Sequence, residues 1–258
     1  MAGKPRALAI AAHPDDIEFM MAGTLLLLKQ AGYEIHYMTV ANGCCGSVIC
    51  GRDELARTRR AEAMSAAHLA GAVFHDSLVN DLEVFYNKET LAQLAAVVRE
   101  VAPEIILTHH PEDYMEDHIN TSRLAVSAAF VREMPNFPTN PSREATHQEV
   151  ALYHCVPHVL QNQLRQPIMP EIYVDVAGVM DLKKAMLSEH KSQKDWLDQS
   201  QGMGSYVNTM VEQCQAIGKL SGKFDIAEGW IPHLHTGLCA KDSNPLVKAL
   251  EGKGVILQ

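Results

Sequence analysis

A short apolar run near the start of the chain ends in the tetrapeptide His13-Pro14-Asp15-Asp16. Residues 6–12 (RALAIAA) are typical of a buried strand, so an imidazole and two carboxylates follow its carboxyl end. In open α/β sheets, binding sites form at this end of the strands. His13 and Asp16 can converge on one cation, which leaves Asp15 free to accept a proton. The alternative is that Asp15 or Asp16 only caps the following helix, and the tetrapeptide alone does not separate the two interpretations.

A second polar cluster follows another predicted strand, residues 104–108. The run from His109 to His118 is rich in histidine and acidic residues, and His118 lies early in the next predicted helix. Together, His13, Asp16 and His118 would supply three ligands and leave a fourth position to water, as in catalytic zinc sites. Such ligands also accept other divalent ions. Two clusters at the ends of two strands favour the metal interpretation over the capping one.

The elements that must position these residues alternate along the chain. We expect an α/β fold with a Rossmann-like, mostly parallel sheet and helices on both faces. Residues 1–258 are expected to form a single domain, in which the part from about 178 onward is a candidate small subdomain. The predicted strands are residues 6–12, 34–40, 72–75, 104–108, 172–176 and 224–231, and the predicted helices are residues 17–30, 53–70, 89–101, 115–132, 179–190 and 203–218.

Composition and charge argue against several classes of partner. The net charge is −9 and no block of Lys and Arg stands out, which disfavours nucleic acid and anionic membranes. No stretch approaches the ~20 apolar residues of a membrane span, and the start of the chain lacks a signal-peptide core, so we expect a cytoplasmic protein. The six cysteines form no CxxC pair and are expected to be free thiols. We also expect a homo-oligomer. No GxGxxG follows the first strand, which disfavours a nucleotide site.

At these positions the sequence resembles the PIG-L/LmbE-type zinc-dependent de-N-acetylases, an N-acetylglucosaminyl deacetylase-like family. Residues 12–16 correspond to the family's AHPDD signature, and Asp117-His118 to the end of its third-ligand motif. The resemblance implies that His13, Asp16 and His118 bind zinc and that Asp15 is the general base. It also implies a small N-acetylated substrate. Further matches are Asn42-Gly43, Arg59-x-x-Glu62, His190–Gln193 and Ala227-Glu228.

One position departs from the family pattern. Many members have His-Pro-Asp-His where this chain has Met115-Glu116-Asp117-His118. The first histidine of that pattern often stabilises the oxyanion, and a methionine cannot donate a hydrogen bond. Losing one such donor can lower the rate by ~10²–10³-fold. We therefore expect a nearby replacement, with His110 and Tyr114 as the candidates by sequence proximity.

Further polar residues are expected to have structural or substrate-binding roles. Arg59 lies on an otherwise apolar face of its predicted helix, where a charge needs a partner. It either pairs with Glu62 or, as the resemblance suggests, reaches substrate oxygen atoms. Asp81 matches a loop acid that in relatives tends to meet the sugar. We expect His190 to bond helix carbonyls, and we expect surface positions for His233 and His235. His36, His68 and His75 are interpreted as structural.

These observations predict a zinc-dependent hydrolase that removes an acetyl group from an N-acetylated amino sugar or sugar conjugate. Asp15 would take a proton from the attacking water and return it to the departing amine. Two alternatives remain. One is an amidase acting on a non-sugar N-acyl metabolite, and the other is a metal-holding binding protein in which Met115 marks lost catalysis.

Overall fold

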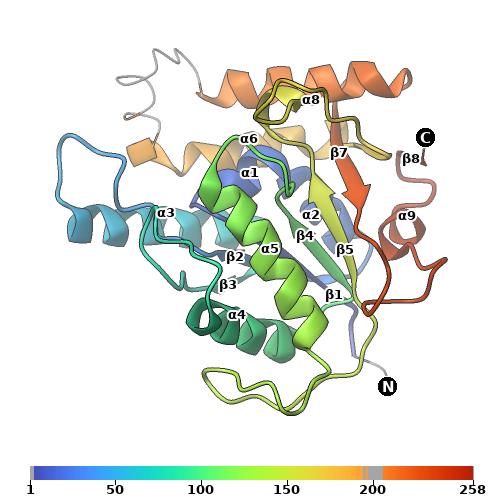
Figure 1. Ribbon diagram of the computed structural model, residues 1–258. Helices are drawn as coiled ribbons and strands as arrows, with labels where there is room; N and C mark the ends of the chain where they lie inside the picture. The colour runs from blue at the N-terminus through green and yellow to red at the C-terminus, as the bar shows by residue number, and fades with distance from the viewer. Residues whose placement is uncertain (1–2, 194–195, 197–205, 258) are drawn as a thin grey trace.

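A computed structural model of the protein describes residues 3–193, 196 and 206–257. The described residues form an eight-stranded sheet in the order β3-β2-β1-β4-β5-β7-β6-β8 (Figure 1). The first five strands are parallel to one another, and they are β1 (Arg6–Ala11), β2 (Glu34–Thr39), β3 (Val73–His75), β4 (Ile105–Thr108) and β5 (Ala151–Cys155). The remaining strands pair antiparallel, and they are β6 (Ile172–Asp175), β7 (Ala227–Pro232) and β8 (Val255–Leu257).

Helices cover both faces of this sheet, which confirms the predicted mostly parallel α/β fold (Figure 1). One face carries α1 (Asp16–Met20), α2 (Ala22–Gln30), α3 (Arg52–Ala70), α6 (Met180–Ser188) and α8 (Tyr206–Ser221). The opposite face carries α4 (Lys88–Val101) and α5 (Glu116–Val131). The short helices η1 (His158–Leu160), η2 (Ala177–Val179) and α9 (Pro245–Ala249) lie in the second half of the chain.

Strand β1 shows why the sheet needs both layers of helices. Ala7, Ala9 and Ala11 belong to the core on the α2–α3 face, whereas Leu8 and Ile10 belong to the core on the α4–α5 face. Successive side chains of a strand point to opposite faces, so a strand that is buried on both sides is apolar throughout. The apolar run before His13 thus reflects a central strand, and β1 lies between β2 and β4.

The helix predicted over residues 17–30 is wrong as a single element, because it breaks at Met21 into α1 and α2. A buried ion pair from distant segments occupies the break. Lys183 Nζ donates to the carbonyl of Phe19, 3.1 Å away, and also pairs with the Glu228 carboxylate. That carboxylate accepts hydrogen bonds from the amides of Gly23 and Thr24 at 2.8 and 2.7 Å. Backbone groups that a continuous helix would pair internally therefore have partners from elsewhere.

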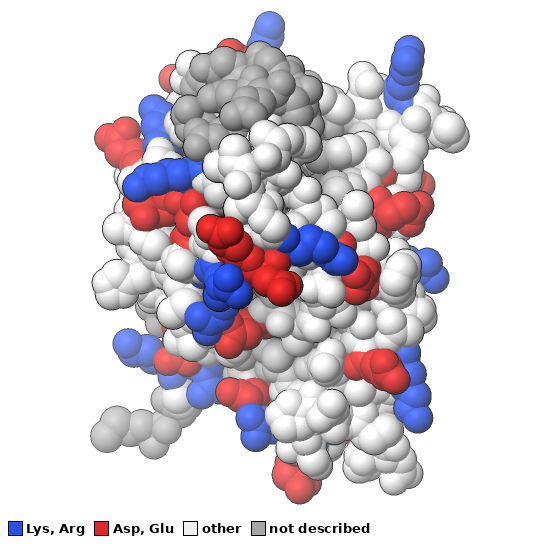
Figure 2. Space-filling model, turned by 90° about the vertical axis from the view of Figure 1, so that its left-hand side faces the viewer, with Lys and Arg blue, Asp and Glu red and all other residues white. Residues whose placement is uncertain are grey.

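The second half of the chain differs from the predicted pattern in its pairing. Strands β6, β7 and β8 are antiparallel, and neither α9 nor β8 was predicted from the sequence. The predicted helix over residues 203–218 corresponds to α8, and its first three positions lie outside the described residues. None of the described helices has the length and apolar character that crossing a bilayer requires. On the face drawn in Figure 2, acidic and basic side chains are interspersed.

The topology brings the two polar clusters together. Strand β1 pairs with β4 in parallel, with Ile10 opposite Thr108, so the segments after both strands emerge at one edge of the sheet. The tetrapeptide follows β1 there and leads directly into α1. The segment after β4 leads into α5, whose first turn contains His118.

Candidate metal centre and active site

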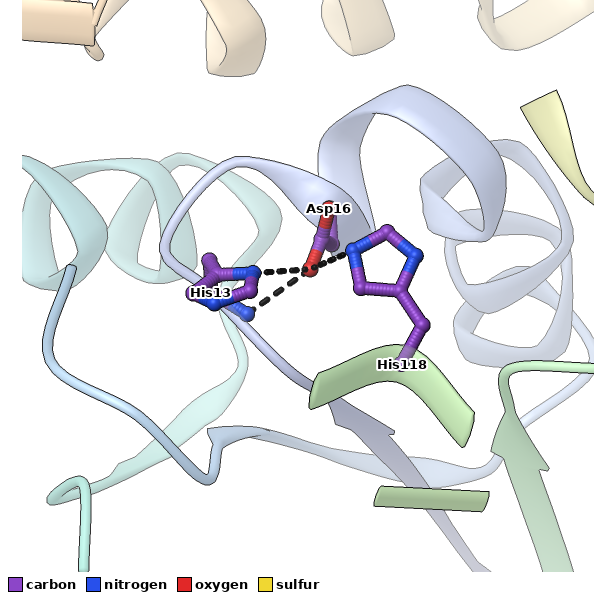
Figure 3. Close-up of side chains that lie close together, drawn as sticks. All are labelled: His13, Asp16 and His118. Atoms are coloured by element: carbon purple, nitrogen blue, oxygen red, sulfur yellow. Dashed lines mark hydrogen bonds and ion pairs between the residues drawn. The ribbon is translucent and has the colours of Figure 1, made fainter. Parts of the chain in front are cut away.

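Three predicted ligands converge at this edge of the sheet (Figure 3). Asp16 Oδ2 lies 3.4 Å from His13 Nδ1 and 3.4 Å from His118 Nε2. All three side chains are buried, and one ligand atom from each falls within 4.8 Å of the others. Asp15 is the N-cap residue of α1 but makes no capping hydrogen bond through its side chain. The Asp16 carboxylate accepts from the His13 amide at 2.7 Å, so it also stabilises the turn.

The second ring nitrogen of each histidine faces another carboxylate. His13 Nε2 lies 3.0 Å from Asp117 Oδ2 and 3.1 Å from Asp81 Oδ1. His118 Nδ1 lies 3.0 Å from Asp113 Oδ1. Metal-bound histidines usually donate their other N–H group to such a partner, which fixes the ring and raises its basicity.

The electrostatics of the cluster favour a positive charge. Burial alone would lower the pKa of His13, but hydrogen bonds to Asp117, Asp16 and Asp81 raise this pKa well above its ordinary value. Burial also opposes protonation of His118, whose pKa is nevertheless raised by Asp16 and Asp113. Two imidazole nitrogens and one carboxylate, surrounded by further carboxylates, fit the donor chemistry of a divalent cation such as zinc. These residues could therefore hold a metal.

Asp15 lies beside this triad but is not part of it. Its backbone is in the left-handed region (φ 108°), which is strained for a residue other than glycine. Tyr206 Oη donates to Asp15 Oδ2 at 2.9 Å, and Arg59 Nη2 lies 3.4 Å from Asp15 Oδ1. Burial raises the pKa of Asp15 to about 6, although the nearby charge of Arg59 opposes this shift. The structure thus places a buried, strained carboxylate next to the candidate metal ligands.

Arg59 does not pair with Glu62, so that interpretation is wrong. Its guanidinium donates to the carbonyl of Gly43 at 3.2 Å and to the carbonyl of Pro14. Glu62 instead accepts from the amide and hydroxyl of Ser192 at 2.9 and 2.6 Å. The close approach of Arg59 also explains Gly43, because a Cβ there would lie 2.3 Å from Arg59 Nη1. Arg59 therefore holds the turn that carries Asp15.

A cavity of about 510 Å³ lies beside the triad. Two of the other predicted substrate residues line this cavity, and one does not. Asp81 lines this cavity and accepts from the Cys45 amide at 3.1 Å. Tyr114 also lines it, with its ring centroid 5.4 Å from that of His118. His110 is not among the lining residues, and its Nδ1 accepts from the Glu112 amide at 3.0 Å. Met115 lines the cavity, and the remaining wall includes Phe19, Met20, Leu82, His158, Trp196 and Tyr206.

Several site residues were missed or misplaced by sequence reasoning. Asp113 and His109 stood in the second cluster, but nothing in the pattern indicated that His109 would stack on His118 with centroids 4.0 Å apart. Tyr206 had no signal at all. The interpretation of His190 was wrong: its ring is buried, with Nε2 3.3 Å from Glu18 Oε1. His233 is partly buried rather than on the surface, with its Nδ1 2.9 Å from His154 Nε2.

The interpretations of His36, His75 and the cysteines agree with the structure, whereas His68 is exposed. His36 Nδ1 and His75 Nε2 lie 2.9 Å apart across neighbouring strands, as expected of structural residues. All six cysteines are free thiols.

The family model described as PIG-L, GlcNAc-PI de-N-acetylase, matches residues 8–129, the segment that carries the triad. This match covers just under half of the chain, so it shows a similarity to the PIG-L family over this segment. Diacetylchitobiose deacetylase of Thermococcus kodakarensis is 26% identical over 195 residues, covering 73% of this chain and 70% of the relative. The 4-oxalmesaconate hydratase of Pseudomonas putida is 28% identical over 193 residues, covering 70% and 71%.

Solved structures share the fold of this chain. N,N′-diacetylchitobiose deacetylase from Pyrococcus horikoshii superposes with a TM-score of 0.72 at 24% identity, covering 89% of this chain and 84% of that one. The relatives thus include proteins named as deacetylases of N-acetylated sugars and a protein named as a hydratase.

Proposed function

We propose that the protein is a metal-dependent hydrolase that removes the acetyl group from an N-acetylated amino sugar or sugar conjugate. The observation that carries this proposal is the placement of Asp15. Its buried carboxylate lines the same cavity as His13, Asp16 and His118, but it is not needed as a ligand. A carboxylate beside a cation site is suited to general base catalysis. The relatives that are named as sugar deacetylases support an amide as the bond that is cleaved.

The residues then have separate roles. His13, Asp16 and His118 hold the cation, and zinc is favoured by this ligand set. The cation supplies Lewis-acid activation of the carbonyl and of the attacking water. Asp15 accepts the proton of that water and later delivers it to the leaving amine. Arg59 and Tyr206 hold the Asp15 carboxylate in place, because each contacts one of its oxygens.

The oxyanion donor that Met115 cannot supply is assigned to Tyr114. Of the two candidates from the sequence, Tyr114 lines the cavity, whereas His110 is engaged by its own turn. Tyr114→Phe is therefore expected to lower kcat by about 10²-fold, as for other single oxyanion donors, and His110→Phe to leave it unchanged. Intact turnover in the double variant would contradict the assignment of a nearby side-chain donor.

The direct test is Asp15→Asn, with acetate release measured on a panel of N-acetylated sugars and N-acetylated amino acids. General acid–base catalysis contributes about 10²–10⁴-fold, and a loss of that size is expected while the metal content stays unchanged. Asp242→Asn, at an exposed acid, is the matched control. Full activity of Asp15→Asn would refute the base assignment. Acetate release from the N-acetylated amino acids alone would favour the non-sugar amidase. Bound metal without turnover of any substrate would favour a metal-holding protein.

A second candidate is the addition of water to an activated double bond, because one relative is named a hydratase of an oxalmesaconate. A substrate with several carboxylates needs cations in its site. Here the proposed divalent ion would be one such cation, but Asp15, Asp16 and Asp81 also line the cavity, and the lining guanidinium of Arg59 already has backbone partners. We therefore rank amide hydrolysis first. Loss of the absorbance of a conjugated carboxylate substrate, without acetate release from any amide, would reverse this order.

A further inference from the structure

The wall of the cavity beyond the triad is built from rings. Phe19 stacks on Tyr206 with centroids 5.3 Å apart and an interplanar angle of 27°. His158 meets the edge of Phe19 at 5.3 Å and 84°, and Tyr114 approaches His158 at 6.4 Å. Met20 and Leu82 add aliphatic surface. These side chains come from α1, α8, η1 and two loops, so the aromatic surface is assembled by the fold and not by one local run.

Among the described residues of this wall, the polar side chains of His158, Tyr206 and Asp81 have internal partners, whereas the buried Oε1 of Gln193 has none. His158 Nδ1 lies 2.7 Å from Gln213 Oε1, and Tyr206 donates to Asp15. Asp81 is engaged by His13 and by the Cys45 amide. A polyhydroxylated second sugar would leave its hydrogen bonds with water and find three of these four side chains already engaged, which is costly. An apolar group has no hydrogen bonds with water to lose when it enters the cavity.

The mouth of the cavity continues this apolar character. Leu82 and Tyr114 line the cavity and are 58% and 57% exposed. Exposed apolar side chains that line a cavity are typical of a binding site. The cavity volume also falls in the range of about 300–1,000 Å³ of pockets for small organic ligands.

We propose that this aromatic wall binds an apolar, ring-containing group joined to the unit that bears the amide. The inference rests on the proposed function and narrows its substrate class. The substrate is an N-acetylated amino sugar conjugated to an apolar aglycone, and not a member of a glycan chain. The hydrophobic effect then contributes to binding at the wall, and the reacting amide lies at the triad.

The test compares acetate release from the phenyl and methyl glycosides of N-acetylglucosamine and from N,N′-diacetylchitobiose. We expect kcat/KM for the phenyl glycoside to exceed that of the methyl glycoside by about tenfold, with chitobiose no better than the methyl glycoside. Equal values for the two glycosides, or a preference for chitobiose, would overturn this inference and leave the deacetylase proposal standing. No acetate from any of the three would count against the proposed function itself.

Two variants test whether the aromatic wall causes the preference for the phenyl glycoside. Leu82 has φ of +61°, a conformation that asparagine tolerates well, so Leu82→Asn removes the apolar group without added backbone strain. We expect the ratio of phenyl to methyl turnover to fall towards one in Leu82→Asn. Phe85→Asn is the control, because Phe85 is equally exposed (59%) in the same loop but is not a lining residue. An unchanged ratio in Leu82→Asn, or an equal fall in both variants, would contradict the proposal.

Discussion

Replacing Lys183 by methionine is expected to destabilise the protein far more than the loss of a surface ion pair. Lys183 is fully buried and Glu228 is 1% exposed, so neither charge can be solvated by water. Lys183→Met leaves the Glu228 carboxylate with two amide donors and no cation, and it leaves the Phe19 carbonyl without its donor. Breaking a buried pair by removing one partner typically costs about 3–5 kcal/mol.

Removing both charges should cost less than the two single changes together. In Lys183→Met with Glu228→Gln, no net charge stays buried, and the glutamine oxygen can still accept from Gly23 or Thr24. One amide donor is then left unpaired, for about 1–3 kcal/mol, and the Phe19 carbonyl adds about 1 kcal/mol. If each single change costs about 3–5 kcal/mol, the coupling between the two sites is at least about 2 kcal/mol.

Urea unfolding followed by circular dichroism would measure the four free energies of this cycle. Arg52→Met is the control, because the Arg52–Glu83 pair is 56% and 46% exposed and is expected to contribute less than about 1 kcal/mol. Additive costs, or a loss below about 1 kcal/mol in Lys183→Met, would refute the argument that this pair stabilises the break between α1 and α2. A variant that does not fold alone but folds when combined with Glu228→Gln would support it.

Three further predictions follow from the contacts around the site. Tyr206→Phe removes the donor to Asp15 Oδ2 and is expected to lower kcat about tenfold with little change in KM. An unchanged kcat would contradict the proposal that Tyr206 positions the Asp15 carboxylate. Removing metal with a chelator should lower the melting temperature, and adding zinc at about a thousand times its Kd should restore about 4 kcal/mol in the wild type but not in His118→Ala. Burial lowers the pKa of His154 to about 3, below its unfolded value near 6.5, so its contribution to stability is present above pH 6.5 and lost as the pH falls towards 3. Between pH 7 and 5, the free energy of unfolding of the wild type should therefore fall by about 2 kcal/mol more than that of His154→Gln. If urea titrations show the same fall in both proteins, His154 does not make this contribution.

Much of the fold was predictable because its signals are local. An apolar run such as Ala7–Ala11 indicates a central strand. The helix predicted over residues 53–70 ends at Ala70 as α3 does, and Gly71 follows it with φ of +62°, a conformation that favours glycine. The break at Met21 was not predictable in this way. It depends on Lys183 and Glu228, which are far away in the sequence, whereas the apolar pattern of residues 17–30 fits a continuous helix. The antiparallel pairing of β6 with β7 and β8 also depends on segments that lie apart in the sequence.

In the candidate site, too, some residues were predictable from local sequence and others depend on distant contacts. His13, Asp16 and His118 were predictable because each follows a strand whose carboxyl end must lie at one edge of a parallel sheet. Arg59 was recognised as a charge that needs a partner, but its partners are main-chain carbonyls, which have no signature in a sequence. Tyr206 reaches Asp15 only because α8 packs across the sheet from the other end of the chain. Since these distant contacts hold Asp15 and form the aromatic wall, the candidate metal ligands are the part of the site that local sequence predicts best, whereas the shape of the cavity depends on tertiary packing.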